Sequence, residues 1–255
     1  MDLSSKSISI VGCGWLGLPL GCLLVKNGYT VWGSCTKSEK QTCLIENGIR
    51  PFVFHTSQQI TAHSFWESQV VIITLPFKRG LENPHTYYQD IQKILKALRH
   101  HPYLIFTSST AVYPSYNQVW YEEDEIPSIS LRYDTLRSVE KMILAEFPSA
   151  VLRLGGLYGP KRDPKDFVKK IFDEEERVNL ISQSHAVILI QRILEKKLTG
   201  IYNIVNSAHP KKKEFYSALG IPIQTKPGGS YKIISNQKLL KALNINDSFF
   251  NTKIK

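Results

Sequence analysis

"SISIVGCGWLGLPLGCLLVKNGYTVW" occupies residues 7–32 and joins a β-branched run, a glycine cluster and a leucine-rich run. The first run, at residues 8–11, is typical of a strand and stops at Gly12. Leucines then recur at helical spacing up to residues 26–28, Lys-Asn-Gly, which form an ordinary helix end. A second β-type run begins at Tyr29. The stretch therefore predicts strand, glycine turn, helix and strand, which together make a βαβ unit.

The same stretch is apolar enough over residues 8–25 to be compared with a signal peptide or a membrane helix. Four glycines and Pro19 interrupt it, whereas a spanning helix needs about 20 largely uninterrupted apolar residues. No small-x-small cleavage site follows, because the next residues are Val-Lys-Asn-Gly at 25–28. We therefore expect a cytoplasmic protein without a membrane partner.

Within the unit, Gly12-Cys13-Gly14-Trp15-Leu16-Gly17 matches the G-x-G-x-x-G pattern of dinucleotide-binding turns. The first glycine of that pattern permits a tight turn, the second lets the backbone approach a pyrophosphate, and the third lets helix and strand pack closely. The start of the helix directs free N–H groups at the anion. The alternative is a glycine-rich turn beside an empty pocket. We predict cofactor contacts from Gly12, Gly14, Trp15, Leu16 and Gly17.

The residues after the second strand bear on which nicotinamide cofactor binds. An NAD site usually has an acid about 20 residues after the first glycine, where it holds the ribose hydroxyls. Here residues 33–38 read Gly-Ser-Cys-Thr-Lys-Ser, and no acid occurs before Glu39. We predict that Ser34, Thr36 and Lys37 receive a 2′-phosphate, so that NADP is preferred and NAD is the alternative. Lys37 could instead be a surface lysine at the start of the next helix.

Apolar runs and helical patterns alternate along the following residues, which favours an α/β fold with a doubly wound, Rossmann-like parallel sheet. The continuous apolar runs at 70–76 and 103–107 predict strands that are covered on both faces. In such sheets ligands bind at the carboxyl ends of the strands. We expect these ends at Gly12, Pro76, Ser109 and Gly156. The predicted cofactor contacts accordingly extend to Leu75, Pro76 and Gly156.

The pattern loosens in the last third of the chain. We expect an NAD(P)-binding core in residues 1–158, and a C-terminal segment in residues 159–255 that completes the sheet and forms a small substrate-side lobe. The loop at 158–164 is basic, and its Arg162 is a hypothetical bidentate clamp for a diphosphate. His185 is expected at the surface or as a helix cap.

Composition limits the partners. The 255 residues include 32 Lys and Arg against 22 Asp and Glu, a net charge of +10, which favours anionic partners in general. Only residues 211–213 form a basic block, so we expect a solvated face and no nucleic-acid groove. The four cysteines include no C-x-x-C pair. They are interpreted as small buried residues, and no metal site is predicted.

Three motifs occur in order: residues 12–17, then FTSSTAVYP at 106–114, then LRLGGLYGP at 152–160. Together they resemble the extended short-chain dehydrogenase/reductase family, also called the NAD-dependent epimerase/dehydratase family. The resemblance spans nearly the whole chain. It implies hydride transfer between a nicotinamide cofactor and a nucleotide sugar or a similar small carbonyl or alcohol. A homodimer is a further expectation at the level of the family.

The resemblance also implies catalytic roles. Ser109, four residues before Tyr113, matches the family serine that orients the substrate oxygen, and a turn cap is the alternative. The family's Tyr-x-x-x-Lys is replaced by Tyr133-Asp-Thr-Leu-Arg137, in which Tyr133 is the expected acid/base. Arg137 favours the phenolate but cannot pass on a proton. The family also has an acidic residue further along the same helix. Glu140 aligns with that residue only if Tyr133 is one residue away from the position of the family's tyrosine.

Two alternatives remain open. Tyr113 is a second, fallback acid/base, although a structural or substrate-lining role is more common for such a tyrosine. If the Tyr-x-x-x-Arg variant is inactive, the chain is a dinucleotide-binding sensor or regulatory protein with a degenerate active site.

Overall fold

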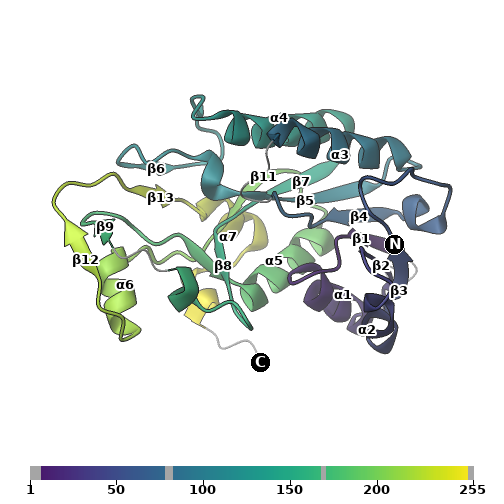
Figure 1. Ribbon diagram of the computed structural model, residues 1–255, viewed down its shortest axis with the longest axis horizontal. Coiled ribbons are helices and arrows are strands. Elements are labelled where there is room, and N and C mark those ends of the chain that lie inside the picture. Colours follow the sequence, from purple (N-terminus) through teal and green to yellow (C-terminus); the bar gives the residue numbers. More distant parts are fainter. Residues whose placement is uncertain (1–6, 78–82, 168–170, 252–255) are drawn as a thin grey trace. The chain divides into compact units, whose positions relative to one another are not determined.

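The computed structural model describes residues 7–77, 83–167 and 171–251 (Figure 1). Within these residues a seven-stranded parallel sheet has the order β11-β7-β5-β4-β1-β2-β3. Its strands are β1 (Ser7–Val11), β2 (Thr30–Cys35), β3 (Arg50–Val53), β4 (Val70–Ile73), β5 (Tyr103–Ser109), β7 (Ser149–Leu154) and β11 (Gly200–Ile204). The predicted Rossmann-like α/β fold is confirmed.

The strand order reverses at β1. The chain first moves outward through β2 and β3, and then crosses to β4 on the other side of β1. In register, Ile10 of β1 lies beside Gly33 of β2 and Ile72 of β4. Such a switch point is where open parallel sheets bind their ligands, at the carboxyl ends of the strands.

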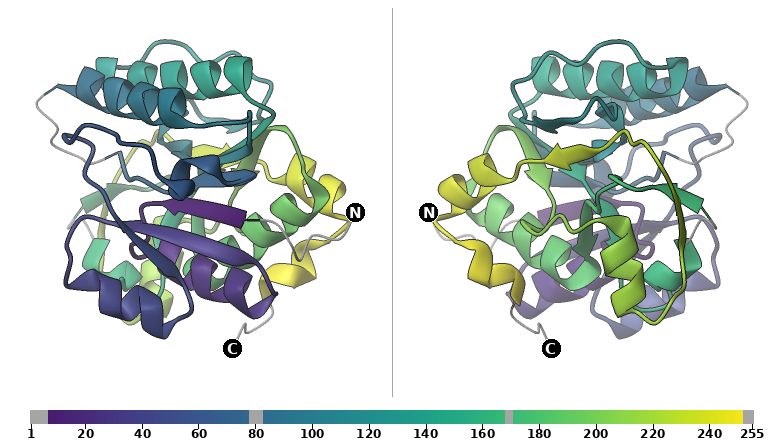
Figure 2. Two further views of the ribbon diagram at one scale, coloured as in Figure 1. Left: turned by 90° about the vertical axis from the view of Figure 1, so that its right-hand side faces the viewer. Right: turned by 90° about the vertical axis from the view of Figure 1, so that its left-hand side faces the viewer.

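Helices cover both faces of this sheet. Figure 2 shows α3 and α4 on one face and α1 and α2 on the other. Their bounds are α1 (Gly17–Lys26), α2 (Lys40–Glu46), α3 (Pro84–Ala97) and α4 (Leu131–Glu146), and α5 (Gln183–Lys196) precedes β11. The start of α3 is fixed locally, because the Asn83 side chain accepts the His85 N–H at 2.9 Å and Pro84 occupies the first turn.

The central strands are buried on both faces, as the continuous apolar runs predicted. All four residues of β4 are buried, and so are Ile8, Ile10 and Val11 of β1. Full burial of one such side chain stabilises the fold by about 1.5–3 kcal/mol. The carboxyl end of β1, where the candidate site begins, is therefore anchored in the core.

Contacts divide the chain into two compact units. The first comprises Met1–Ser108, Ser130–Leu152 and Ile190–Gly200, and the second Ser109–Ile129, Arg153–Leu189 and Ile201–Lys255. Considered by itself, the second unit contains three parallel strand pairs and two further helices. These are β6 (Gln118–Trp120) with β13 (Lys232–Ile234), β8 (Gly156–Tyr158) with β10 (Leu180–Ser182), β9 (Ile171–Asp173) with β12 (Gln224–Lys226), α6 (Lys212–Ala218) and α7 (Gln237–Leu243). The predicted boundary after residue 158 stays a prediction.

Two sequence expectations need correction. Cys43 is exposed and Cys22 half-buried, so only Cys13 and Cys35 are the buried cysteines that were expected. His185 is neither exposed nor a simple cap. It is buried, with Nδ1 2.6 Å from Ser182 Oγ and Nε2 3.2 Å from the Phe249 carbonyl. In the described part of the chain, no helix is long and apolar enough to cross a membrane.

Candidate functional site

The turn between β1 and α1 is held by both neighbouring strands. Gly12 has a φ of +100°, which residues with a side chain rarely adopt. Its N–H donates to Ser34 Oγ at 2.8 Å, and its carbonyl accepts from Thr74 Oγ1 at 2.7 Å. The Cys13 N–H donates to the Ser34 carbonyl at 2.8 Å. The ends of β2 and β4 thus fix the position of the turn.

The other two glycines of the motif differ in the space around them. A Cβ at Gly17 would clash with the Gly12 carbonyl oxygen and lie 2.9 Å from Thr74 Oγ1, so only glycine lets α1 approach the turn. A Cβ at Gly14 would meet only the Gly12 oxygen, at 4.0 Å, and Gly14 is exposed. The protein therefore leaves space beside Gly14 that a pyrophosphate can occupy.

Two backbone N–H groups of the turn, those of Leu16 and Gly17, are not used within the described structure. The Gly14 N–H bends back to the Gly12 carbonyl at 2.7 Å, and the Leu18 N–H bonds to the Gly14 carbonyl at 2.9 Å. The N–H groups of Leu16 and Gly17 have no acceptor among the described residues. Such groups at a helix start carry partial positive charge and bind anions. The residues present therefore fit the diphosphate of a dinucleotide.

The side chains of the predicted cofactor contacts are exposed to different degrees. Trp15 is half-buried, whereas the Leu16 side chain is buried, which leaves its backbone for contact. Ser34 is buried and uses its hydroxyl to hold Gly12, while Thr36 and Lys37 are exposed just beyond β2. The contact of Ser34 with a 2′-phosphate stays a prediction. Thr36 and Lys37 are more accessible than Ser34 for such a contact.

The segment after β4 is fixed by α3 and α4. Tyr87 of α3 donates its hydroxyl to the Leu75 carbonyl at 3.0 Å. Arg132 of α4 donates to the Phe77 carbonyl at 2.6 Å, with its guanidinium 4.2 Å from the centre of the Phe77 ring. Burial raises the pKa of Tyr87 above its ordinary value, so its hydroxyl stays a donor. Leu75 and the exposed Pro76 are thereby held next to the glycine turn, as the closeness of the Leu75 side chain to Gly12 shows.

Helix α4 carries the predicted acid/base. Six of its residues are buried and define its inner face: Thr135, Leu136, Val139, Glu140, Met142 and Ile143. At about 100° per residue, Arg132 falls in the middle of that face and Tyr133 about 100° away, at its margin. Glu140 accepts a hydrogen bond from the Ser108 hydroxyl inside the first unit.

Arg132 is the residue that reasoning from the sequence missed. The sequence signal for it was Glu140. If Glu140 is aligned with the acid on the family's helix, Arg132 falls at the position of the family's tyrosine, and Leu136 falls at the position of its lysine. Tyr133 lies at the margin of the inner face and Arg137 lies outside it, with the Arg137 guanidinium 3.6 Å from the Asp134 carboxylate. The catalytic roles of Tyr133 and Arg137 stay predictions.

Ser109 belongs to the second unit, where it ends β5 and caps a short 3-10 helix, η2 (Thr110–Val112). Its Oγ accepts the Ala111 N–H at 3.1 Å, which is the turn cap named as an alternative. The bond leaves the hydroxyl proton of Ser109 for another acceptor. Lys232 Nζ donates to the carbonyls of Thr110 and Tyr113, and burial lowers its pKa to about 8, with a smaller effect from the charge of Lys212.

Tyr113 is an anchor of this turn. Its hydroxyl donates to Asn203 Oδ1 at 2.9 Å and accepts from Arg153 Nη1 at 2.7 Å, and 1% of the residue is exposed. Burial raises the pKa of Tyr113 to about 12, although the Arg153 charge acts in the opposite direction. A covered, protonated phenol of this kind does not serve as the fallback acid/base.

Two further predicted contacts also belong to the second unit. Gly156 opens β8, and its N–H donates to the Asn179 carbonyl at 2.8 Å. A Cβ there would clash with the Leu180 side chain, which explains the glycine by packing. Arg162 is exposed in a turn that bridges to Gly159. The cofactor contact of Gly156 and the diphosphate contact of Arg162 stay predictions.

No protein-family model matches the chain. Protein YeeZ of Escherichia coli K12 is 30% identical over 259 residues, a match that covers 93% of this chain and 94% of YeeZ. The chain therefore has a relative whose sequence is similar over nearly the full length of both chains.

Solved structures share the fold over nearly the full length. The UDP-glucuronic acid 4-epimerase of Bacillus cereus in complex with NAD superimposes with a TM-score of 0.77 at 18% identity, covering 94% of this chain and 91% of that one. The UDP-N-acetylglucosamine 4-epimerase of Methanobrevibacter ruminantium M1 in complex with UDP-N-acetylmuramic acid gives 0.73 at 15% identity, with 95% and 93% covered. The chain therefore belongs to one family with YeeZ, and its structural neighbours confirm the resemblance to the extended short-chain dehydrogenase/reductase family, the NAD-dependent epimerase/dehydratase family.

Proposed function

We propose that the protein binds a nicotinamide dinucleotide at the β1–α1 turn and uses it for hydride transfer on a nucleotide sugar or a similar small carbonyl or alcohol. One observation carries the proposal: the N–H groups of Leu16 and Gly17 have no acceptor in the described structure, beside the open space at Gly14. Solved relatives in complex with NAD or a nucleotide sugar support it.

The chain's own residues would bind and orient the reactants. When bound, the cofactor supplies the carbon that accepts or returns the hydride. Ser109 donates its free hydroxyl proton to the substrate oxygen, since Oγ already accepts the Ala111 N–H. Tyr133 of the first unit is the residue proposed to exchange a proton with the substrate. Arg137 lies one helical turn after Tyr133 on α4, and its guanidinium is 3.6 Å from the Asp134 carboxylate.

For the cofactor we propose a preference for NADP. Thr36 and Lys37 are exposed at the end of β2, where no acid precedes Glu39 to hold free ribose hydroxyls. The solved relative of Bacillus cereus is in complex with NAD, which keeps NAD as the alternative. A cytoplasmic location, which was expected from the sequence, and a homodimer, which is an expectation at the level of the family, remain part of the proposal.

A dinucleotide-binding sensor is the second candidate. Arg132 occupies the middle of the inner face of α4. When the helix is aligned with the family through Glu140, Arg132 stands at the position of the tyrosine, and the buried Leu136 stands at the position of the lysine. An arginine does not shed a proton at neutral pH. This arrangement favours a protein that keeps the cofactor turn without the catalytic pair.

Two measurements separate the candidates. Calorimetric titration with NAD and NADP tests the cofactor site, which both candidates require. Absorbance at about 340 nm, followed with each nicotinamide cofactor and a panel of nucleotide sugars, tests hydride transfer. An enzyme either changes the absorbance with one sugar or, if it returns the hydride to the sugar, converts that sugar into an isomer that chromatography detects without a net absorbance change. It loses this activity in Ser109→Ala, whereas a sensor binds the cofactor and converts none of the sugars. Absence of binding contradicts both.

A further inference from the structure

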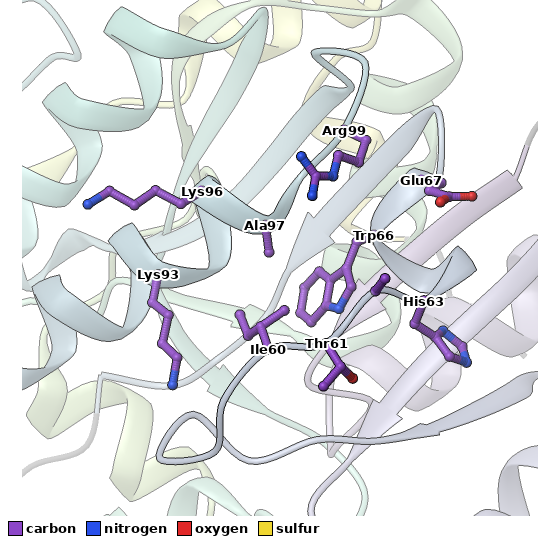
Figure 3. A pocket seen from close by; sticks show the side chains of 10 residues that line it. Ile60, Thr61, His63, Trp66, Glu67, Lys93, Lys96, Ala97 and Arg99 are labelled. Atoms are coloured by element: carbon purple, nitrogen blue, oxygen red, sulfur yellow. The ribbon is translucent and has the colours of Figure 1, made fainter.

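The hollow of about 330 Å³ beside Trp66, in the first unit, offers a ligand only surface side chains. Trp66 is 2% exposed, so its ring is covered, and in Figure 3 the Lys96 side chain extends away from Trp66 and Arg99. A more specific arrangement occurs within the second unit, where Lys232 is bonded to the turn that follows Ser109.

Lys232 opens β13, and its neighbours fix its backbone. β13 pairs with β6 in parallel, with Lys232 opposite Gln118 (Figure 1). In addition, the Lys232 carbonyl accepts from Asn179 Nδ2 at 2.9 Å, and Asn179 Oδ1 accepts from the Ile234 N–H at 3.0 Å. The side chain of Lys232 therefore extends from a fixed point of the second unit.

The Lys232 ammonium joins the two ends of η2. Its Nζ donates to the Thr110 carbonyl at 3.0 Å and to the Tyr113 carbonyl at 2.5 Å. Thr110 opens the 3-10 helix and Tyr113 follows its last residue, and the Tyr113 N–H donates back to the Thr110 carbonyl at 3.2 Å. The internal hydrogen bonds of 3-10 helices have poor geometry, and carbonyls at a helix end need outside donors. Lys232 supplies such a donor, with charge-assisted bonds that are stronger than neutral ones.

Lys232 carries its charge in a place that disfavours it. Burial of the amino group lowers the pKa of Lys232 to about 8, and the Lys212 ammonium lowers it further. Lys212 is paired with Glu176 at 2.8 Å, whereas Lys232 forms no ion pair among the residues that the structure describes. Burying a cation without a counter-charge lowers stability, so the fold alone does not account for this lysine.

The position of η2 decides where the Ser109 hydroxyl lies. Ser109 Oγ accepts the Ala111 N–H at 3.1 Å, and that N–H is part of η2. We propose that Lys232 is a positioning residue: by holding both ends of η2, it keeps the Ser109 hydroxyl where the substrate oxygen meets it. The proposal rests on the role of Ser109 in the proposed function. Displacing a reacting group by about 1 Å can lower a rate about 100-fold, so such a contact can matter for turnover.

The effect of Lys232 on η2 is tested first, without substrate. Lys232→Met keeps an unbranched apolar chain and removes the ammonium. We expect the Ala111 N–H to exchange with deuterated water about tenfold faster or more in this variant, because its bond to Ser109 loosens. The Gly155 N–H, bonded to the Ile204 carbonyl in the same unit, should exchange no faster, which shows that the unit stays folded. Lys213→Met, at an exposed lysine of α6, should leave both rates unchanged.

Turnover is tested with the nucleotide sugar that the wild type converts. Lys232→Met should lower kcat about tenfold or more, while KM for the sugar and the affinity for the dinucleotide stay within about twofold, since only the alignment of Ser109 is lost. Lys213→Met should behave as the wild type. The proposal is overturned if Ala111 exchanges at the wild-type rate in Lys232→Met, or if kcat is unchanged in that variant while the wild type is active. If the wild type converts no sugar, the proposed function fails and the positioning role fails with it, a result distinct from either of the others.

Discussion

Alanine at the second and third glycines of the turn should separate cofactor binding from folding. At Gly17 the new Cβ clashes with the Gly12 oxygen and lies 2.9 Å from Thr74 Oγ1 and 3.1 Å from Ile10 Cγ2. Overpacking of this kind costs about 1–3 kcal/mol. The better helix propensity of alanine offsets up to about 1 kcal/mol of it. We expect Gly17→Ala to lower the free energy of unfolding by about 1–2 kcal/mol.

At Gly14 the nearest atom to a new Cβ is 4.0 Å away, and the backbone φ is not in the left-handed region. The free energy of unfolding should therefore stay within about 0.5 kcal/mol of the wild type. The methyl group occupies the space proposed for the pyrophosphate, however. Dinucleotide affinity should fall at least tenfold, which corresponds to about 1.4 kcal/mol.

Urea unfolding of the free proteins gives the stabilities, and calorimetric titration with NAD and NADP gives the affinities. Because Gly14→Ala is a stable variant, a loss of binding in it cannot be attributed to unfolding. The reasoning is refuted if Gly14→Ala binds dinucleotide as the wild type does. It also fails if Gly17→Ala is as stable as the wild type, since the close approach of α1 to the turn would then be absent.

Three further predictions concern single side chains. In calorimetry, Lys37→Ala should lower the affinity for NADP about five- to tenfold and leave the affinity for NAD unchanged, because the lysine would contact only the 2′-phosphate. Equal losses of affinity for both cofactors would refute this role. Burial lowers the pKa of Lys232 from 10.5 to about 8 in the folded protein. Between these pH values the unfolded chain therefore binds more protons, and the contribution of Lys232 to stability increases as pH rises through this window. Relative to Lys232→Met, the wild type should gain about 1–3 kcal/mol from pH 8 to 10.5 in urea unfolding; a constant difference contradicts the shift. Tyr133→Phe should abolish turnover with a reactive nucleotide sugar while cofactor affinity stays within about twofold, since the phenol would act only in proton transfer; full retained turnover would move the acid/base to another residue.

The β1–α1–β2 unit was predictable because its signals are local. A β-branched run, a glycine turn and leucines at helical spacing follow one another within residues 7–32. Parallel strands also place their carboxyl ends at one edge, so Gly12 and Pro76 could be assigned to the same side of the sheet. These features depend on periodicity and chain order, which a single sequence displays.

The roles of individual side chains depended on long-range packing. Ser34 was predicted as a cofactor contact, but the pairing of Ile10 with Gly33 places its hydroxyl on the Gly12 N–H. The position of Arg132 became visible only when burial defined the inner face of α4. Tyr113 is anchored by Asn203, 90 residues further along the chain, a pairing that no local pattern indicates.

The most direct test of the central claim is a crystal structure of the protein with NADP or NAD bound. We predict diphosphate oxygens within about 2.7–3.2 Å of the Leu16 and Gly17 backbone nitrogens, with the diphosphate passing over Gly14. A dinucleotide held elsewhere, with these two N–H groups facing solvent, would contradict the account.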